Sequence, residues 1–204
     1  MTSEAEHTVV PRKNLVAVFS NGLFRRAFLA FLAWSFLFGV ILAYAPLYAH
    51  KSFGFPDEQI TALFFGYFAF TSGVRLFMNK LTRRFSKEKL LVSSLLGGTV
   101  MTLLMALGGS PATFAVAFVL LGVAQGIVYP TSAMIVAGAF GLEELLSANS
   151  IYLSASDLGQ TLGPVFASVL AENYGIPYAL SISSIPVALA GILVVRTRSP
   201  KREG

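Results

Sequence analysis

Long apolar stretches separated by short polar breaks dominate the chain. Residues 27–49 are 23 consecutive uncharged residues, and residues 90–142 form a block of 53 residues without Asp, Glu, Lys or Arg. At 1.5 Å per residue, the first stretch makes about 34 Å of helix, which is enough to cross the hydrocarbon layer of a bilayer. The pattern therefore predicts membrane-spanning helices.

Turn signals divide the apolar stretches into six expected spans. The strongest is residues 108–111 (GGSP), which splits the uncharged block in two. Glu143 and Glu144 are expected to close the fourth span. The spans are expected at 27–49, at about 59–79, in the two parts of the 90–142 block, at about 145–171, and in a last segment that ends at 196.

Composition supports a membrane protein. Hydrophobic residues make up 55% of the 204 residues and charged residues only 12%, against about 25% charged in a soluble domain. We expect an all-α integral membrane protein with a tail at 1–26, a six-helix domain at 27–196 and a second tail at 197–204. Residues 14–24 of the first tail have the composition of a short interfacial helix.

The basic residues sit at the ends of the apolar runs, which is the pattern of topology anchors and lipid headgroup contacts and not of a nucleic-acid surface. With the N-terminus inside, the inner segments carry thirteen Lys and Arg, and the outer loops carry only Lys51. Because Lys and Arg are retained on the cytoplasmic side, the charges predict a multi-pass protein of the cell membrane with both termini in the cytoplasm.

Signals for enzymes are absent from the sequence. It has no Cys and only two His, so it offers no disulfide framework, no thiolate metal site, no H-E-x-x-H motif and no serine–histidine pair within a span. It also lacks the glycine-rich phosphate loop of an ATP-driven motor. We expect a protein that is not an enzyme and needs no cofactor or metal ion.

Asp157 is the only acid deep within any expected span. An ionisable residue near mid-membrane is costly, and it can take up a coupling proton or bind a cation. The alternative is a structural carboxylate, held in a hydrogen bond or paired with Arg75. Arg75 lies in the last turn or so of the second span, where it is expected to reach the cytoplasmic surface as an anchor or a gate residue.

Polar side chains of the first, second, fourth and fifth spans recur at helical spacing and form stripes. Polar groups in hydrocarbon must face protein or a water-filled cavity, so these stripes predict a solute cavity. The alternative is that they only join neighbouring helices. The candidate cavity residues are Trp34, Tyr44, Tyr67, Thr71, Gln125, Tyr129, Asn149, Tyr152 and Gln160.

Several segments resemble those of the major facilitator superfamily. The loop at 79–87, NKLTRRFSK, is similar to the family signature G-x-L-x-D-R-x-G-R. Further similarities are Pro46-Leu47-Tyr48, Gly122-x3-Gly126-x3-Pro130, Asp157-Leu158-Gly159 and Leu162-Gly163-Pro164. The resemblance implies the C-terminal six-helix half of a twelve-helix transporter, built as a 3+3 inverted repeat, with the first tail similar to the linker between the halves.

The loop departs from the signature at three positions. Arg83 stands where the family has its acid, and Asn79 and Ser86 replace the two glycines. The resemblance therefore implies a topology and cytoplasmic gate role for Arg84 and Lys87, without a working acid latch.

The resemblance also implies secondary transport of a small solute by alternating access. From its mid-membrane position, Asp157 is the residue expected to bind the coupling proton. The aromatic first two spans and the lone acid favour an amphipathic or cationic solute. Three alternatives remain open. The chain pairs with a second six-helix chain or with itself to form a carrier, or it is a fragment that does not transport, or it is a six-helix scaffold. In each case its other partners are membrane lipids.

Overall fold

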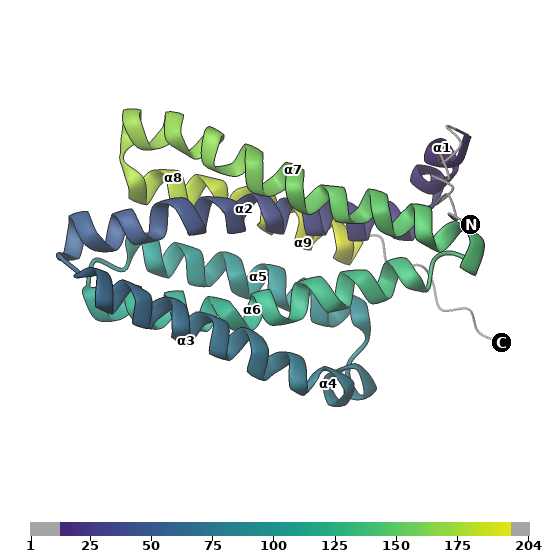
Figure 1. Cartoon of the computed structure of the whole chain (residues 1–204), viewed down its shortest axis with the longest axis horizontal. Coiled ribbons are helices and arrows are strands. Elements are labelled where there is room, and N and C mark those ends of the chain that lie inside the picture. Colours follow the sequence, from purple (N-terminus) through teal and green to yellow (C-terminus); the bar gives the residue numbers. More distant parts are fainter. Residues whose placement is uncertain (1–12, 197–204) are drawn as a thin grey trace, which may run out of the picture.

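The structure is a computed structural model that describes residues 13–196, and the tails at 1–12 and 197–204, with their predicted cytoplasmic placement, lie outside the described residues. The described part is entirely helical and forms one elongated bundle (Figure 1). Its helices are α1 (Lys13–Ser20), α2 (Gly22–Phe53), α3 (Asp57–Leu76), α4 (Met78–Arg84), α5 (Lys87–Leu107), α6 (Pro111–Ala137), α7 (Leu142–Tyr174), α8 (Ile176–Ser183) and α9 (Ile185–Arg196).

Four segments are long and apolar enough to cross a bilayer: α2, α5, α6 and the α8–α9 segment. The bent pair α3–α4 makes a fifth candidate. With 33 residues, α7 has the length of a span, but its polar residues lower its hydropathy, and it packs along α2 within the bundle. The arrangement is that of a six-helix membrane domain, as the hydropathy pattern predicts.

The turn predicted at 108–111 is confirmed, since α5 ends just before it and α6 begins at Pro111. The predicted limits of the second span are wrong. The chain bends by 56° between α3 and α4, because Phe77 leaves helical geometry (φ −94°, ψ 2°) and its N–H bonds the Val74 carbonyl three residues back. Glu143 and Glu144 also do not close the fourth span but lie in the first turn of α7. The Glu144 carboxylate is favourable there because the helix N-terminus carries partial positive charge.

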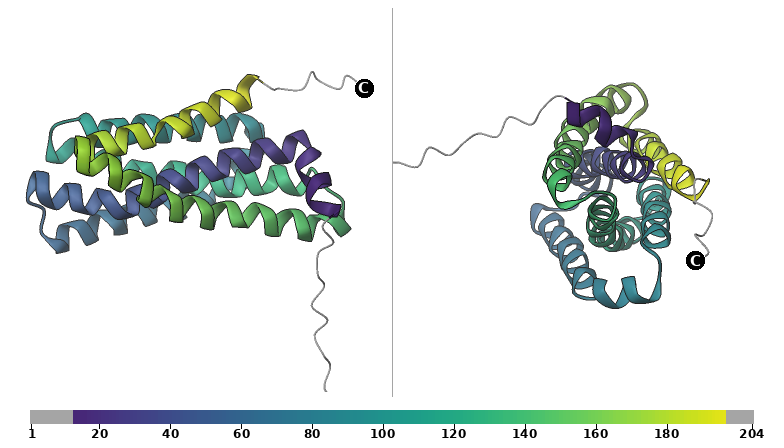
Figure 2. Two further views of the ribbon diagram at one scale, coloured as in Figure 1. Left: turned by 90° about the horizontal axis from the view of Figure 1, so that it is seen from above. Right: turned by 90° about the vertical axis from the view of Figure 1, so that its right-hand side faces the viewer.

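Helix contacts repeat in a two-fold manner. α2 packs along α7 as α6 packs along α3, and α5 packs on α6 as α8 and α9 pack on α2. If α2, α3 and α5 form one repeat and α6, α7 and α8–α9 the other, these contacts correspond in pairs, whereas the α7–α8 contact has no comparable α3–α5 counterpart. The two repeats begin at opposite ends of the bundle (Figures 1 and 2). This is the pattern of a 3+3 inverted repeat, as the sequence resemblance implies.

Two glycines let the long helices approach closely. A Cβ atom on Gly122 of α6 would lie 2.2 Å from the carbonyl oxygen of Tyr67 in α3. A Cβ atom on Gly163 of α7 would lie 2.2 Å from the carbonyl oxygen of Phe36 in α2. Each glycine thus allows backbone-to-backbone contact at one of the two equivalent crossings, as small residues do between membrane helices.

One end of the bundle, called the basic end below, gathers the α1–α2 junction, α4 and the α6–α7 loop (Figure 1). It carries Arg25, Arg26 and the cations of the segment from Lys80 to Lys89. The opposite end carries the α2–α3, α5–α6 and α7–α8 connections. Successive spans run in opposite directions, so the basic connections all lie at one end of the bundle. This is the arrangement that the distribution of Lys and Arg predicts.

Candidate functional site

The middle of α7 presents an exposed polar strip. Ser154, Asp157 and Thr161 are all exposed, and their spacing of three and four residues places them on one side of the helix. Leu158 and Leu162, also exposed, form a neighbouring apolar strip on the same helix. The strip is therefore a chemically distinct line on the surface of the six-helix domain.

The candidate cavity residues that the sequence predicts on this helix are Asn149, Tyr152 and Gln160, which lie outside the exposed strip. Only Asp157 of the exposed strip was singled out. The signal that could have found it is the i, i+4, i+7, i+11 series that begins at Ser150 and passes through Asp157.

Asp157 has no structural partner within residues 13–196. No ion pair joins it to Arg75, and no hydrogen bond from the described residues reaches its carboxylate. Arg75 is itself exposed, next to the last residue of α3 at the basic end. The alternative reading of an Asp157–Arg75 pair therefore has no support in this arrangement.

Trp34 is buried and holds three helices together. Its indole N–H donates to the side-chain oxygen of Gln125 in α6. Its ring lies against Gly98 of α5, where an added Cβ would come within 2.4 Å of a ring carbon. Trp34 is thus a packing residue at the α2–α5–α6 contact, whereas Gln125 is half-buried.

Tyr129 and Tyr152 belong to an aromatic cluster with Phe31 of α2. The Phe31 and Tyr152 rings stack with centroids 4.6 Å apart, and the Tyr129 ring lies 5.6 Å from Phe31. The Tyr152 hydroxyl and the Ser132 hydroxyl are 2.7 Å apart and share a hydrogen bond between α7 and α6. Tyr152 is fully buried, but Tyr129 is exposed, so only Tyr129 can reach a solute from this surface.

Tyr67 and Thr71 are buried at the crossing of α3 with α6. The Thr71 hydroxyl lies 2.9 Å from the Tyr67 carbonyl and 3.0 Å from the Gly122 carbonyl, so it can donate within its own helix or across to α6. The Tyr67 hydroxyl has no hydrogen-bond partner among the described residues. Both side chains are part of the packed interior.

Four of the nine predicted cavity residues are therefore buried in the bundle: Trp34, Tyr67, Thr71 and Tyr152. Their stripes face neighbouring helices of the same chain, because helical spacing shows which residues share a face and not what covers it. The other five are at least partly accessible: Tyr44, Gln125, Tyr129, Asn149 and Gln160. Within α7, the Gln160 amide donates to the Ser156 hydroxyl at 2.7 Å.

The predicted gate residues Arg84 and Lys87 are exposed at the basic end, away from the α7 strip. The Lys87 ammonium donates to the Met134 carbonyl near the end of α6, at 3.4 Å. Among residues 13–196, no three His, Asp or Glu side chains come together in a way that could hold a metal ion.

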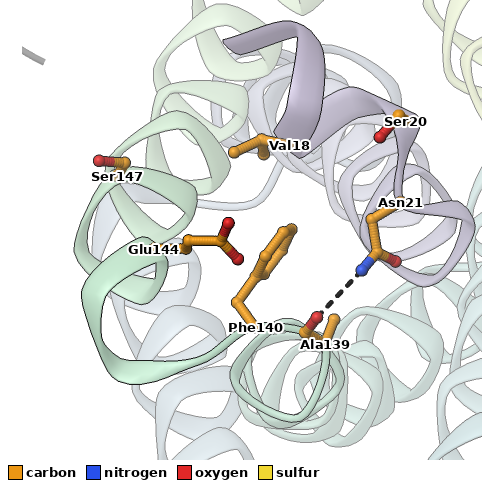
Figure 3. Close-up of a pocket in the computed structure, with 7 residues that line it drawn as sticks. All are labelled: Val18, Ser20, Asn21, Ala139, Phe140, Glu144 and Ser147. Carbon is orange, nitrogen blue, oxygen red and sulfur yellow. Dashed lines mark hydrogen bonds between the residues drawn. The ribbon is translucent and has the colours of Figure 1, made fainter. Parts of the chain in front are cut away.

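A polar cavity of about 370 Å³ lies at the basic end, between the α1–α2 junction, the α6–α7 loop and the start of α7 (Figure 3). Asn21 forms one side of it: its amide donates to the Ala139 carbonyl at 3.0 Å, and its oxygen accepts from the Leu23 N–H at 2.9 Å to cap α2. Glu144 extends towards Phe140 across the cavity (Figure 3). This cavity is far along the bundle from the middle of α7, so it is not the predicted mid-membrane cavity.

Comparison with protein families gives one finding. The family model described as Major Facilitator Superfamily matches residues 27–204. A search of curated proteins gives no match. The matched region begins within α2 and includes α3 to α9, with the polar strip of α7.

Proposed function

Because the chain belongs to the major facilitator superfamily, we propose that it is the C-terminal half of a secondary carrier that moves a small solute by alternating access. In this proposal the polar strip of α7 faces the translocation cavity, and a second six-helix unit supplies the other wall. Membership of the family supports a multi-pass transporter that contacts solute and membrane lipids. The orientation, with both termini cytoplasmic, rests on the distribution of Lys and Arg.

The observation that carries the proposal is the exposure of Ser154, Asp157 and Thr161 in the middle of a membrane-length helix. An Asp at the centre of a lipid-facing helix costs about 2.5–3.5 kcal/mol on insertion scales, and the hydroxyls add to this cost. Lipid is therefore an unfavourable neighbour for this strip. A water-filled cavity between this domain and a second six-helix unit would hydrate the strip and remove the free-energy cost of exposing it to lipid.

Asp157 is the proposed coupling residue. It is exposed and has neither an ion pair nor a hydrogen bond within the described residues, so its carboxylate is free to take a proton or a cation from a water-filled cavity. The accessible residues Gln125, Tyr129, Asn149 and Gln160 are proposed to bind solute, together with Tyr44. Arg75, Arg84 and Lys87 are proposed to act at the cytoplasmic gate.

The absence of Cys from the sequence makes the cavity directly testable. Single cysteines replace Ser154 and Thr161 in the strip, and matched controls replace Leu158 and Leu162 beside it, all in the membranes of the natural host. The thiolate is the nucleophile that attacks a thiol reagent, and it forms in water and not in hydrocarbon. We expect a hydrophilic thiol reagent to label Ser154→Cys and Thr161→Cys about tenfold faster than the controls, or more.

Equally slow labelling at all four positions would mean that the strip faces lipid, and the proposed cavity would then be wrong. A disulfide between two copies of the Ser154→Cys chain would place the strip at a self-association surface. That result would support the scaffold reading instead of the carrier.

Coupling is tested with Asp157→Asn, which keeps the shape of the side chain and removes its charge. A solute is first found by its ability to stabilise the purified protein against heat. We expect Asp157→Asn to lose uptake driven by a proton gradient and to retain exchange of labelled for unlabelled solute, because exchange needs no net proton movement. Uptake at the wild-type rate would refute the coupling role.

A further inference from the structure

The segment around α4 combines exposed apolar and exposed cationic side chains. Leu76 is 83% exposed, Phe77 62% and Phe85 43%, although all three are large and apolar. Exposed cations occupy the same segment: Lys80, Arg83, Arg84, Lys87 and Lys89. We call the set formed by Leu76, Phe77, Phe85, Lys80, Arg83 and Arg84 the α4 patch.

The bend of the chain brings these groups together. α4 leaves α3 at 56° and connects to α5 across the basic end, at the periphery of the bundle (Figure 2). Met78 is buried and fixes α4 to the bundle, and the Thr82 hydroxyl bonds the Met78 carbonyl at 2.9 Å. The patch is therefore fixed at the end of the α3 span, where α4 turns away from the axis of α3.

The cations of the patch have unused donors. Within residues 13–196, the side chains of Lys80, Arg83 and Arg84 make no ion pair and no hydrogen bond. Arg84 lies over the Phe85 ring, with its guanidinium carbon 5.8 Å from the ring centre. This contact orients the guanidinium beside an apolar group and leaves its N–H groups free, because a ring face takes none of them as a normal hydrogen-bond acceptor.

From this arrangement we propose that the α4 patch is a binding site for the phosphate headgroup of an anionic phospholipid. Leu76, Phe77 and Phe85 enter the boundary of the acyl region, and the three cations bind the phosphate above it. Amphipathic helices that lie in the membrane interface divide their surface in this way. Lipid binding at the patch is measured without solute, although Arg84 also belongs to the proposed cytoplasmic gate.

A lipid fits this patch better than a protein does. The segment from Lys80 to Lys89 carries five cations and one acid, Glu88, for a net charge of +4. Burying these charges against a protein would require matching acids to offset their desolvation. The headgroup layer provides water and negative charge together, so the cations stay solvated while the apolar side chains leave water.

The test uses the full chain, delipidated in a mild detergent and titrated with phosphatidylglycerol or with phosphatidylcholine of the same acyl chains. Retained lipid is counted by native mass spectrometry. Each Lys or Arg next to an anionic surface contributes about fivefold in affinity. We therefore expect wild type to retain phosphatidylglycerol over phosphatidylcholine, and Arg83→Gln/Arg84→Gln to bind it roughly 25-fold more weakly.

The matched control is Arg25→Gln/Arg26→Gln, which removes two adjacent arginines at the same end of the bundle, outside the patch. This control variant should retain phosphatidylglycerol like wild type. The conservative variant Arg83→Lys/Arg84→Lys should bind phosphatidylglycerol nearly as well as wild type does. That result would exclude misfolding as the reason why Arg83→Gln/Arg84→Gln binds weakly. The proposal is wrong if wild type shows no preference between the two lipids, or if both double Gln variants lose binding equally. It is also wrong if wild type binds phosphatidylglycerol only after a co-purifying second protein has been removed, because the patch would then be a protein interface.

Discussion

Replacing Gly122 by Ala should force apart the crossing of α3 and α6. The added methyl carbon would lie 2.2 Å from the Tyr67 carbonyl oxygen and 3.1 Å from the Thr71 hydroxyl. The first neighbour is backbone and cannot rotate away. To reach an ordinary contact distance, α6 must move away from α3 by about 1 Å, because a packed interior has no void to absorb the methyl group.

The expected cost follows from three contributions. Inserting a methyl group into a packed contact costs about 1–3 kcal/mol. The hydrogen bond from Thr71 to the Gly122 carbonyl, now 3.0 Å long, is stretched, and such bonds between membrane helices are worth about 0.6 kcal/mol on average. Replacing a helical Gly by Ala returns roughly 0.5–1 kcal/mol. We expect Gly122→Ala to lower the free energy of unfolding by about 1–2 kcal/mol.

Unfolding in mixed micelles with increasing SDS measures this change, with the fluorescence of the single, buried Trp34 as the signal. The control is Gly97→Ala on α5, where an added Cβ meets no atom within 4 Å, so that only the gain in helix propensity remains. We expect this control to be as stable as wild type or more stable. If Gly122→Ala unfolds at the wild-type SDS concentration, or if Gly97→Ala is destabilised to the same extent, the close crossing does not contribute as described.

Two further changes test the basic end and the aromatic cluster. Asn21→Ala removes both the α2 cap and the bond to Ala139, so we expect a loss of about 1 kcal/mol and faster hydrogen exchange in α1 and the α6–α7 loop, with exchange in α5 unchanged. Ser132→Ala leaves the buried Tyr152 hydroxyl with a single long hydrogen bond, 3.4 Å to the Tyr129 carbonyl. We expect this change to lower the free energy of unfolding by about 1 kcal/mol. The same substitution should have no effect in a Tyr152→Phe background, where the hydroxyl is already gone.

Hydropathy predicts the long apolar helices because each one must hide its backbone in hydrocarbon. It does not give the limits of α3, and it does not identify α7 as a span, since polar residues lower the hydropathy of that helix. The bend at Phe77 was missed, since the sequence has neither Pro nor Gly at that point. The structural role of Trp34 was missed for another reason. Its polar N–H suggested a cavity, but Gln125, 91 residues away, satisfies it inside the bundle. Helical spacing identifies residues that share a face, and only the tertiary arrangement shows what the face meets.

The two flanking helices, α3 and α7, occupy equivalent places in the inverted repeat but differ in chemistry. α3 exposes aromatic rings, Phe65 and Phe68, and its one cation, Arg75, lies at the basic end. α7 exposes hydroxyls and the Asp157 carboxylate at mid-helix. Symmetry of the backbone therefore does not extend to the surfaces that the two helices offer. For the proposed carrier, the Asp157 carboxylate favours a solute that carries a positive charge.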